Sequence, residues 1–253
     1  MPIQHDFSDL SVLVTGAGRG LGSSVSKKLA SCGATVGLLD IDAASCESAA
    51  ARIRDAGGRA FAYATDVADR SAFAAAAERF AAESGRIDAM VNNAMLLRYE
   101  PIEKVTDEVL DRMLDIGIKG SVWGAQMLLA HMDAERGGAI VNMASPVAER
   151  GYPNTAIYSL VKGAIVTLTK ALATELGPRR VRVNAVAPGS VPTPGAMGLN
   201  DEAEYARRAR TIPLRRLGRE EDNAEAVAWL LSPEASFING EILHVDGGIA
   251  AAG

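Results

Sequence analysis

A tyrosine and a lysine four residues apart, Tyr158 and Lys162, are the residues of this sequence best suited to acid–base chemistry. The apolar pattern of residues 156–176 predicts a helix, and side chains four apart on a helix share one face. A free tyrosine ionises at about pH 10. A cation at about 5 Å, at an effective dielectric of about 20, stabilises a phenolate by roughly 3 kcal/mol. We therefore expect Lys162 to lower the pKa of Tyr158 by roughly two units, although on these five residues alone an inert surface pair is an open alternative.

The elements that must position this pair are short apolar strands that alternate with helices. Strands are expected at residues 11–15, 34–39, 59–65, 87–91, 139–143, 181–186 and 241–245. Helices are expected at residues 23–32, 43–55, 70–84, 107–135 (bent near Gly117 and Gly120), 156–176, 202–210 and 221–231. Apolar strands in strict alternation with helices indicate a parallel sheet covered on both faces. We predict an α/β fold with one doubly wound, mostly parallel sheet, a single Rossmann-type domain over residues 1–253, with a substrate loop at about 190–213.

Polar and glycine-rich clusters follow the expected strands, where ligands bind in such sheets, at the carboxyl ends and the switch in strand order. These clusters are residues 16–22, Asp40, Asp66, residues 92–94, Ser145 and the pair Pro188 and Gly189. Their common position predicts one site at that edge of the sheet.

The glycines at positions 16, 20 and 22 lie between a strand and a helix, the context of a phosphate-binding turn. Glycine lets the backbone approach a pyrophosphate, and the helix N-terminus supplies donors and positive potential. Asp40 ends the next strand, where a carboxylate accepts from both ribose hydroxyls and repels a 2′-phosphate. Arg19 is the counter-argument, since its guanidinium can reach a phosphate. We give Asp40 the greater weight and expect NAD as the cofactor, in preference to NADP.

Composition excludes several other classes of protein. The chain has 253 residues, 48% of them hydrophobic, and a net charge of −5 without a long basic block, so we expect no nucleic-acid partner. Cys32 and Cys46 form neither a metal-type spacing nor a disulfide framework, and no metal site is expected. Residues 1–9 contain no apolar signal region, and no run approaches the ~18 apolar residues of a membrane span. We therefore expect a cytoplasmic protein with no membrane partner.

Taken together, the motifs make the chain resemble the short-chain dehydrogenase/reductase family over essentially its whole length. The matching elements are Thr15-Gly16-x-x-x-Gly20-x-Gly22, Asp66-Val67, Asn92-Asn93-Ala94, Ser145, Tyr158-x-x-x-Lys162, Pro188-Gly189 with Thr193, and Val245-Asp246-Gly247-Gly248. Several motifs in order and at the usual separations make the resemblance highly specific.

The resemblance implies a role for each matching residue. Tyr158 would exchange a proton with the alcohol or carbonyl oxygen, Lys162 would hold the nicotinamide ribose and lower the pKa of Tyr158, and Ser145 would hydrogen-bond the same substrate oxygen. Asp66 and Val67 would frame the adenine. Asn92 and Ala94 would line the cofactor cleft, and Thr193 would fix the carboxamide. The expected cofactor-binding residues are Gly16, Arg19, Gly20, Leu21, Gly22, Asp40, Ile41, Asp66, Val67, Asn92, Ala94, Tyr158, Lys162, Pro188, Gly189, Val191 and Thr193.

The function implied is hydride transfer between NAD and a small-molecule secondary alcohol or ketone, as in an alcohol dehydrogenase or carbonyl reductase. One alternative is an NADPH-dependent 3-oxoacyl-carrier reductase, which Asp40 opposes. Another is a dinucleotide-binding protein that has lost catalysis. Relatives commonly pair through two helices, so a homo-tetramer or dimer is expected, with contacts on the apolar faces of residues 117–132 and 156–176.

The chain departs from the family pattern at two positions. Gly117 stands where the family usually has an asparagine of the water-linked proton path behind the lysine, and Met95 stands where glycine is usual. If the missing amide only tethers a water, Gly117→Asn should change turnover by no more than roughly tenfold and slightly raise stability. The alternative is that a neighbouring side chain, such as Met95, or the substrate occupies the space of the amide, and then the substitution clashes and lowers activity by several orders of magnitude.

Overall fold

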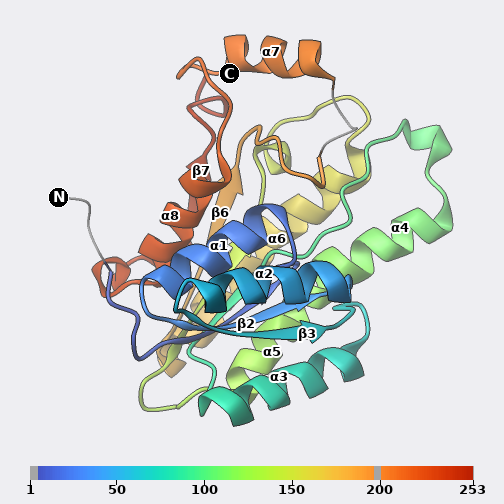
Figure 1. Cartoon of the computed structure of the whole chain (residues 1–253). Helices are drawn as coiled ribbons and strands as arrows, with labels where there is room; N and C mark the ends of the chain where they lie inside the picture. Colours follow the sequence, from blue (N-terminus) through green and yellow to red (C-terminus); the bar gives the residue numbers. More distant parts are fainter. Residues whose placement is uncertain (1–4, 197–200, 253) are drawn as a thin grey trace.

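The computed structural model describes residues 5–196 and 201–252, and their centre is a seven-stranded parallel sheet with the order β3-β2-β1-β4-β5-β6-β7 (Figure 1). Its strands are β1 Ser11–Thr15, β2 Thr35–Asp40, β3 Arg59–Ala64, β4 Ala89–Asn92, β5 Gly138–Met143, β6 Val181–Pro188 and β7 Ile242–Val245. All six pairings are parallel. The predicted doubly wound Rossmann-type fold is confirmed.

Helices cover both faces of the sheet. They are α1 Gly20–Ser31, α2 Ala43–Asp55, α3 Arg70–Ser84, α4 Asp107–Leu114, α5 Gly120–His131, α6 Ala156–Leu176, α7 Glu202–Thr211 and α8 Glu220–Leu231. One buried core joins the sheet to α1, α2 and α8, and a second joins it to α3, α5 and α6. Figure 1 shows α7 apart from these layers, beyond the end of the sheet. Residues 197–200 of the expected substrate loop lie outside the described residues.

The strands read as unbroken apolar runs because each of their two faces is buried. Val12 and Val14 of β1 belong to the core on the α1 side, whereas Leu13 between them belongs to the core on the α3 side. Successive side chains of a strand point to opposite faces, so a sheet covered twice needs apolar residues at every position. This burial fixes the sheet that carries the site residues at its edge.

The helix expected at residues 107–135 is interrupted. It consists of α4, a π-helical turn at Asp115–Lys119, and α5. A π turn inserts an extra residue into the helical ladder and is common at functional sites. The interruption lies at the position where a bend was expected, near Gly117, and it has the form of this π turn.

The segment Ala156–Arg179, which contains α6, has the length and mean hydropathy, 1.4, of a membrane-crossing helix. Within the described chain, however, α6 packs against β6, and its Lys162 and Thr169 are buried polar residues with hydrogen-bond partners in or next to β5. These contacts are those of a core helix on a sheet.

Candidate active site

A cavity of about 450 Å³ lies along the carboxyl ends of the strands and gathers almost every residue expected from the sequence. The expected residues that line it are Gly16, Arg19, Gly20, Leu21, Asp40, Ile41, Asp66, Val67, Ala94, Ser145, Tyr158, Lys162, Pro188, Gly189, Val191 and Thr193. Gly22 and Asn92 do not line it. The chain crosses from β3 on one side of β1 to β4 on the other, and this switch in strand order opens the crevice.

The glycine loop forms a cradle that fits a dinucleotide pyrophosphate. Gly20 begins α1 with a φ of 59°, and a Cβ added there would point at Thr193 across the cavity, 3.4 Å from its Cβ. The preceding residue, Arg19, makes no side-chain capping hydrogen bond, and the first turn of α1 contains no acidic residue. An uncapped helix N-terminus offers N–H donors and positive potential to an anion. A bound nicotinamide dinucleotide would supply the hydride chemistry, with its pyrophosphate held here.

The glycine loop is tied to the end of β4 through Thr15 and Asn93. The Asn93 side-chain amide donates to the carbonyls of Thr15 (2.8 Å) and Gly16 (2.9 Å). The backbone N–H groups of Asn93 and Ala94 both donate to the Thr15 hydroxyl at 3.0 Å. These four bonds hold the loop in register with β4.

The expectation that Asn92 lines the cleft is wrong, and Asn93 takes that place. Asn92 is buried, and its amide donates to the Asn142 side chain at 2.8 Å. A Cβ on Gly124 of α5 would lie 2.1 Å from the Asn92 side-chain oxygen, so the helix approaches closely here. Neighbouring side chains alternate at the end of a strand, so the first asparagine points into the protein and the second towards the cavity. Gly22 is likewise a packing residue, because a Cβ there would lie 2.2 Å from the Gly16 carbonyl oxygen.

Asp40 is fixed at the cavity wall by the backbone. One carboxylate oxygen accepts from the N–H of Gly18 at 2.9 Å, and the other accepts from the N–H of Asp42 at 3.0 Å. Arg19 is exposed and lines the same cavity. Hydrogen bonds from Ser45 lower the pKa of the nearby Asp42, and the charge of Arg19 lowers it a little further. These two bonds fix the orientation of the Asp40 carboxylate at the cavity wall.

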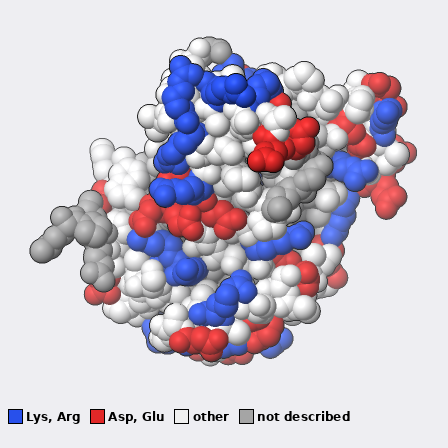
Figure 2. Space-filling model, turned by 45° about the horizontal axis from the view of Figure 1, so that its top comes forward, with Lys and Arg blue, Asp and Glu red and all other residues white. Residues whose placement is uncertain are grey.

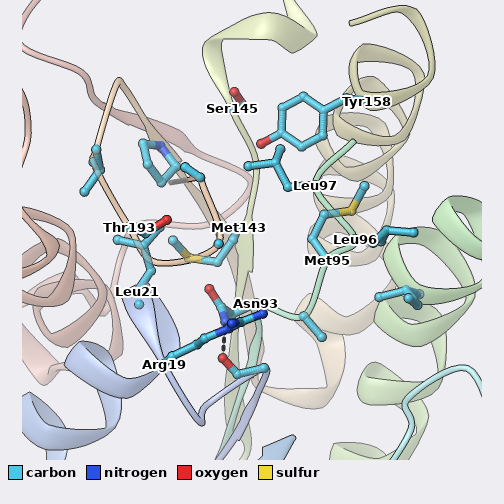
Figure 3. Close-up of a pocket in the computed structure, with 18 of the residues that line it drawn as sticks. Arg19, Leu21, Asn93, Met95, Leu96, Leu97, Met143, Ser145, Tyr158 and Thr193 are labelled. Atoms are coloured by element: carbon cyan, nitrogen blue, oxygen red, sulfur yellow. Dashed lines mark hydrogen bonds between the residues drawn. The ribbon is translucent and has the colours of Figure 1, made fainter. Parts of the chain in front are cut away.

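Ser145, Tyr158 and Lys162 meet on one wall of the cavity. Figure 3 shows the Ser145 and Tyr158 hydroxyl groups turned towards the same space. Ser145 follows β5, where a short turn at Pro146–Ala148 begins, and Tyr158 and Lys162 lie on α6. The Lys162 ammonium donates to the Met143 carbonyl oxygen at 2.6 Å and lies 5.6 Å from the centre of the Tyr158 ring. Lys162 is only 5% exposed, so its charge lies in a part of the cavity wall that is shielded from water.

Burial shifts the acid–base properties of both residues. It lowers the pKa of Lys162 to about 8, because the ammonium loses water. It also raises the pKa of Tyr158, and the neighbouring Tyr99 raises it further, whereas a hydrogen bond with Ser145 lowers it. The expected net lowering of the Tyr158 pKa by Lys162 is therefore wrong for the protein chain alone, because loss of water around the phenol outweighs its partners.

The cavity wall beyond Tyr158 contains residues that the sequence motifs do not include. The Tyr99 ring meets the Tyr158 ring edge to face, with centres 5.5 Å apart. Leu96 and Leu97 add apolar surface, and Tyr205 and Arg208 enter from α7. The sequence contained one signal for the last two residues. Tyr205 and Arg208 are three apart on the helix expected inside the substrate loop, so they share one face of that helix.

Gly117 allows α6 to approach the π turn closely. A Cβ at this position would lie 2.4 Å from Val161 Cγ1 and 3.0 Å from the Met95 sulfur. Val161 is fully buried, and it precedes Lys162 directly. This packing opposes the expectation of a nearly neutral Gly117→Asn and supports the crowding alternative, with Val161 as the first obstacle and Met95 as the second.

A dinucleotide cradle beside a serine, a tyrosine and a lysine defines the class of nicotinamide-dependent oxidoreductases. A family model described as enoyl-(acyl carrier protein) reductase matches residues 16–250. The chain belongs to the short-chain dehydrogenase/reductase family.

The relatives are similar over nearly their whole length. The chain is 38% identical to a cis-4-hydroxycyclohexanecarboxylate dehydrogenase of Sinomonas cyclohexanicum, covering 97% of this chain and 98% of the relative. It is 37% identical to a cyclopentanol dehydrogenase of Comamonas sp., covering 96% and 98%. A solved structure of a 3-ketoacyl-(acyl-carrier-protein) reductase from Brucella melitensis complexed with NADH superposes with a TM-score of 0.88, at 36% identity, covering 95% of this chain and 98% of that one.

Proposed function

We propose that this protein is an NAD-dependent dehydrogenase that oxidises a small secondary alcohol to a ketone and catalyses the reverse reaction. The observation that carries the proposal is the meeting of Ser145, Tyr158 and Lys162 on the cavity that Asp40 also lines. Two relatives whose names describe the oxidation of ring alcohols support this substrate class.

Each catalytic residue has a defined task at the substrate oxygen. The Ser145 hydroxyl hydrogen-bonds the oxygen and steadies its developing charge. The Tyr158 hydroxyl donates its proton to a ketone or, once ionised, takes the proton of an alcohol. The raised pKa of Tyr158 favours the protonated form that donates to a ketone, and the Lys162 ammonium close to its ring favours the ionised form that accepts from an alcohol. The pKa of Tyr158 therefore sets how the rate of each direction depends on pH.

Cofactor preference rests on Asp40. Its carboxylate is fixed by two backbone N–H groups and lines the cavity at the end of β2. A 2′-phosphate placed there would meet a like charge, whereas ribose hydroxyls would donate to it. The expected preference for NAD over NADP is at least about tenfold.

A second candidate function is reduction of a 3-oxoacyl group carried on an acidic protein. Residues 201–219 hold six arginines and three acids, an excess of positive charge around α7. Figure 2 shows basic side chains gathered at the top of the molecule, the end at which Figure 1 places α7, with acidic side chains beside them. Asp40 opposes an NADPH-dependent reductase, and the two relatives named for the oxidation of ring alcohols favour the alcohol dehydrogenase, which we prefer.

The test is a panel of secondary alcohols and their ketones with both cofactors. Formation of NADH from cyclic secondary alcohols, at least about tenfold more efficient than formation of NADPH, is the expected result. Reduction of 3-oxoacyl thioesters by NADPH, without oxidation of free alcohols, would favour the second candidate. Absence of any redox activity alongside NAD binding would leave a dinucleotide-binding protein.

We also propose that the protein is cytoplasmic and assembles as a homo-tetramer or dimer. Cys32 and Cys46 are both free and buried, which suits a reducing compartment. Only 28% of the most apolar window of Ala156–Arg179 is buried within one chain, so a second copy would cover apolar surface on α6. Light scattering at several concentrations tests the assembly.

A further inference from the structure

Arg208 extends from α7 into the wall of the candidate active site. It lines the cavity together with Tyr99 and Tyr205, and its side chain is 33% exposed. Tyr99 connects it to the chemistry, because the Tyr99 ring contacts the Tyr158 ring and the Arg208 charge acts on the Tyr99 hydroxyl. A cation thus lies near enough to Tyr99 to act on its hydroxyl group, in the same cavity as the reacting hydroxyl groups.

The Arg208 guanidinium retains unused hydrogen-bond donors. Its Nε donates to a Glu204 carboxylate oxygen at 2.7 Å, and Glu204 also accepts two bonds from Arg207. Within residues 5–196 and 201–252, the two terminal nitrogens of Arg208 have no hydrogen-bond partner. Two arginines share one carboxylate here, so the cluster retains a net positive charge. The paired terminal nitrogens form a fork that matches a planar carboxylate.

The other charged residues that line the cavity are Arg19, Asp40, Asp66, Arg112 and Lys162, and all of them border the expected cofactor site. Asp66 is paired with Arg112 at 2.8 Å, Asp40 is bound by backbone N–H groups, and Lys162 is bonded to the Met143 carbonyl. The wall beside Tyr158 is otherwise apolar or aromatic, with Met95, Leu96 and Leu97. An apolar wall in the same cavity as a cation that is outside the expected cofactor site is complementary to a hydrocarbon ring that carries an acid group.

We infer that the substrate is a hydroxy acid, a secondary alcohol on an apolar skeleton whose remote carboxylate is bound by Arg208. Tyr99 links the two parts of this site, because its ring contacts Tyr158 and its hydroxyl group feels the Arg208 charge. A carboxylate fits better than a phosphate dianion. Glu204 already forms an ion pair with Arg208, and its negative charge would repel the second negative charge of a phosphate. This inference rests on the proposed dehydrogenase function and adds the substrate class.

The first test measures binding without turnover. Isothermal titration of the enzyme–NADH complex with cyclohexanecarboxylate and with its neutral carboxamide isolates the charge at constant shape. We expect the carboxylate to bind about tenfold more tightly, a moderate value because Arg208 is partly exposed. Arg208→Gln should reduce this ratio to about one, and Arg208→Lys should keep part of it, since the charge remains without the fork.

Arg210→Gln is the matched control. Arg210 is on the same helix and carries the same charge, but it does not line the cavity and has no acidic partner among the described residues. The full preference for carboxylate should remain in this variant. A ratio near one in the wild-type enzyme, a ratio unchanged in Arg208→Gln, an equal loss in Arg210→Gln, or no measurable binding of either probe would each overturn the inference.

A second measurement separates the inference from the proposed function. With 4-hydroxycyclohexanecarboxylate and its carboxamide as substrates, Arg208→Gln should raise KM about tenfold for the acid alone and leave kcat nearly unchanged. If neither compound is oxidised but the binding preference depends on Arg208, the anion site stands and the dehydrogenase proposal fails. If both are oxidised with equal efficiency by the wild type, the dehydrogenase stands and the hydroxy acid assignment fails.

Discussion

Replacing Gly117 by alanine adds one methyl group, and helix propensity and packing have opposite effects on the stability of the resulting protein. Helix propensity favours the change by up to about 1 kcal/mol, because alanine loses less backbone freedom than glycine. Packing opposes it, because the new Cβ would lie 2.4 Å from Val161 Cγ1 and 3.0 Å from the Met95 sulfur. The sign of the measured stability change therefore shows which effect is larger.

The packing term is the larger one. Val161 is fully buried, and a β-branched side chain on a helix has essentially one side-chain rotamer, so it has little room to turn away. Overpacking a buried site costs roughly 1–3 kcal/mol. The net expectation is a loss of about 1 kcal/mol, which lowers the Tm by about 2–4 °C for a chain of this size. Gly117→Asn should lose more, in stability and in turnover, because Val161 adjoins Lys162.

The assay is thermal unfolding of four proteins: wild type, Gly117→Ala, Val161→Ala and the double variant. Removing both Val161 methyl groups leaves a cavity that the new methyl at position 117 partly fills. Gly117→Ala should therefore destabilise the wild type and stabilise the Val161→Ala background, with a coupling of about 1 kcal/mol or more. A rise in Tm from Gly117→Ala in the wild type, or equal effects in both backgrounds, would refute the reasoning.

Three further predictions concern the cavity. Wild-type kcat/KM should be at least about tenfold higher with NAD than with NADP, and Asp40→Ser should narrow that ratio; equal use of both cofactors in the wild type would show that Arg19 dominates. Ser145→Ala should lower kcat about 10²–10³-fold, as loss of an oxyanion donor does, with NAD affinity as the control. Burial lowers the pKa of Lys162 to about 8, so the unfolded chain binds more protons than the native one between pH 8 and about 10, and stability from this group rises with pH there. Lys162→Met should therefore be more stable than wild type at pH 7, with an advantage that shrinks towards pH 10 in denaturant titrations; an advantage that grows with pH would contradict the burial of a charged lysine.

The parts of the site that follow strands were predictable from the sequence. Each strand end is marked by residues that a buried strand does not tolerate, such as Asp40, Asp66 and Ser145, and the sheet itself brings these ends to one edge. The spacing of Tyr158 and Lys162 also fixed their common helix face. These inferences needed only local pattern and a parallel sheet.

Features that depend on side-chain packing were not predictable. A shift of one residue decides whether Asn92 or Asn93 reaches the cavity, and the strand pattern does not resolve it. The closeness of Gly117 to Val161 depends on how two helices distant in sequence approach each other. The raised pKa of Tyr158 depends first on burial of the phenol and then on the electrostatic effect of Tyr99, whereas the spacing of Tyr158 and Lys162 shows only the favourable charge of the lysine.

Transfer of hydrogen from a secondary alcohol to NAD tests the central claim most directly, when wild type is compared with Tyr158→Phe at saturating NAD. With an alcohol deuterated at the carbinol carbon, the account predicts that wild type delivers deuterium to the nicotinamide. Tyr158→Phe should bind NAD with nearly unchanged affinity and transfer at least about 10²-fold more slowly, because only the proton-carrying oxygen is lost. Deuterium transfer by Tyr158→Phe within about tenfold of the wild-type rate would contradict the account.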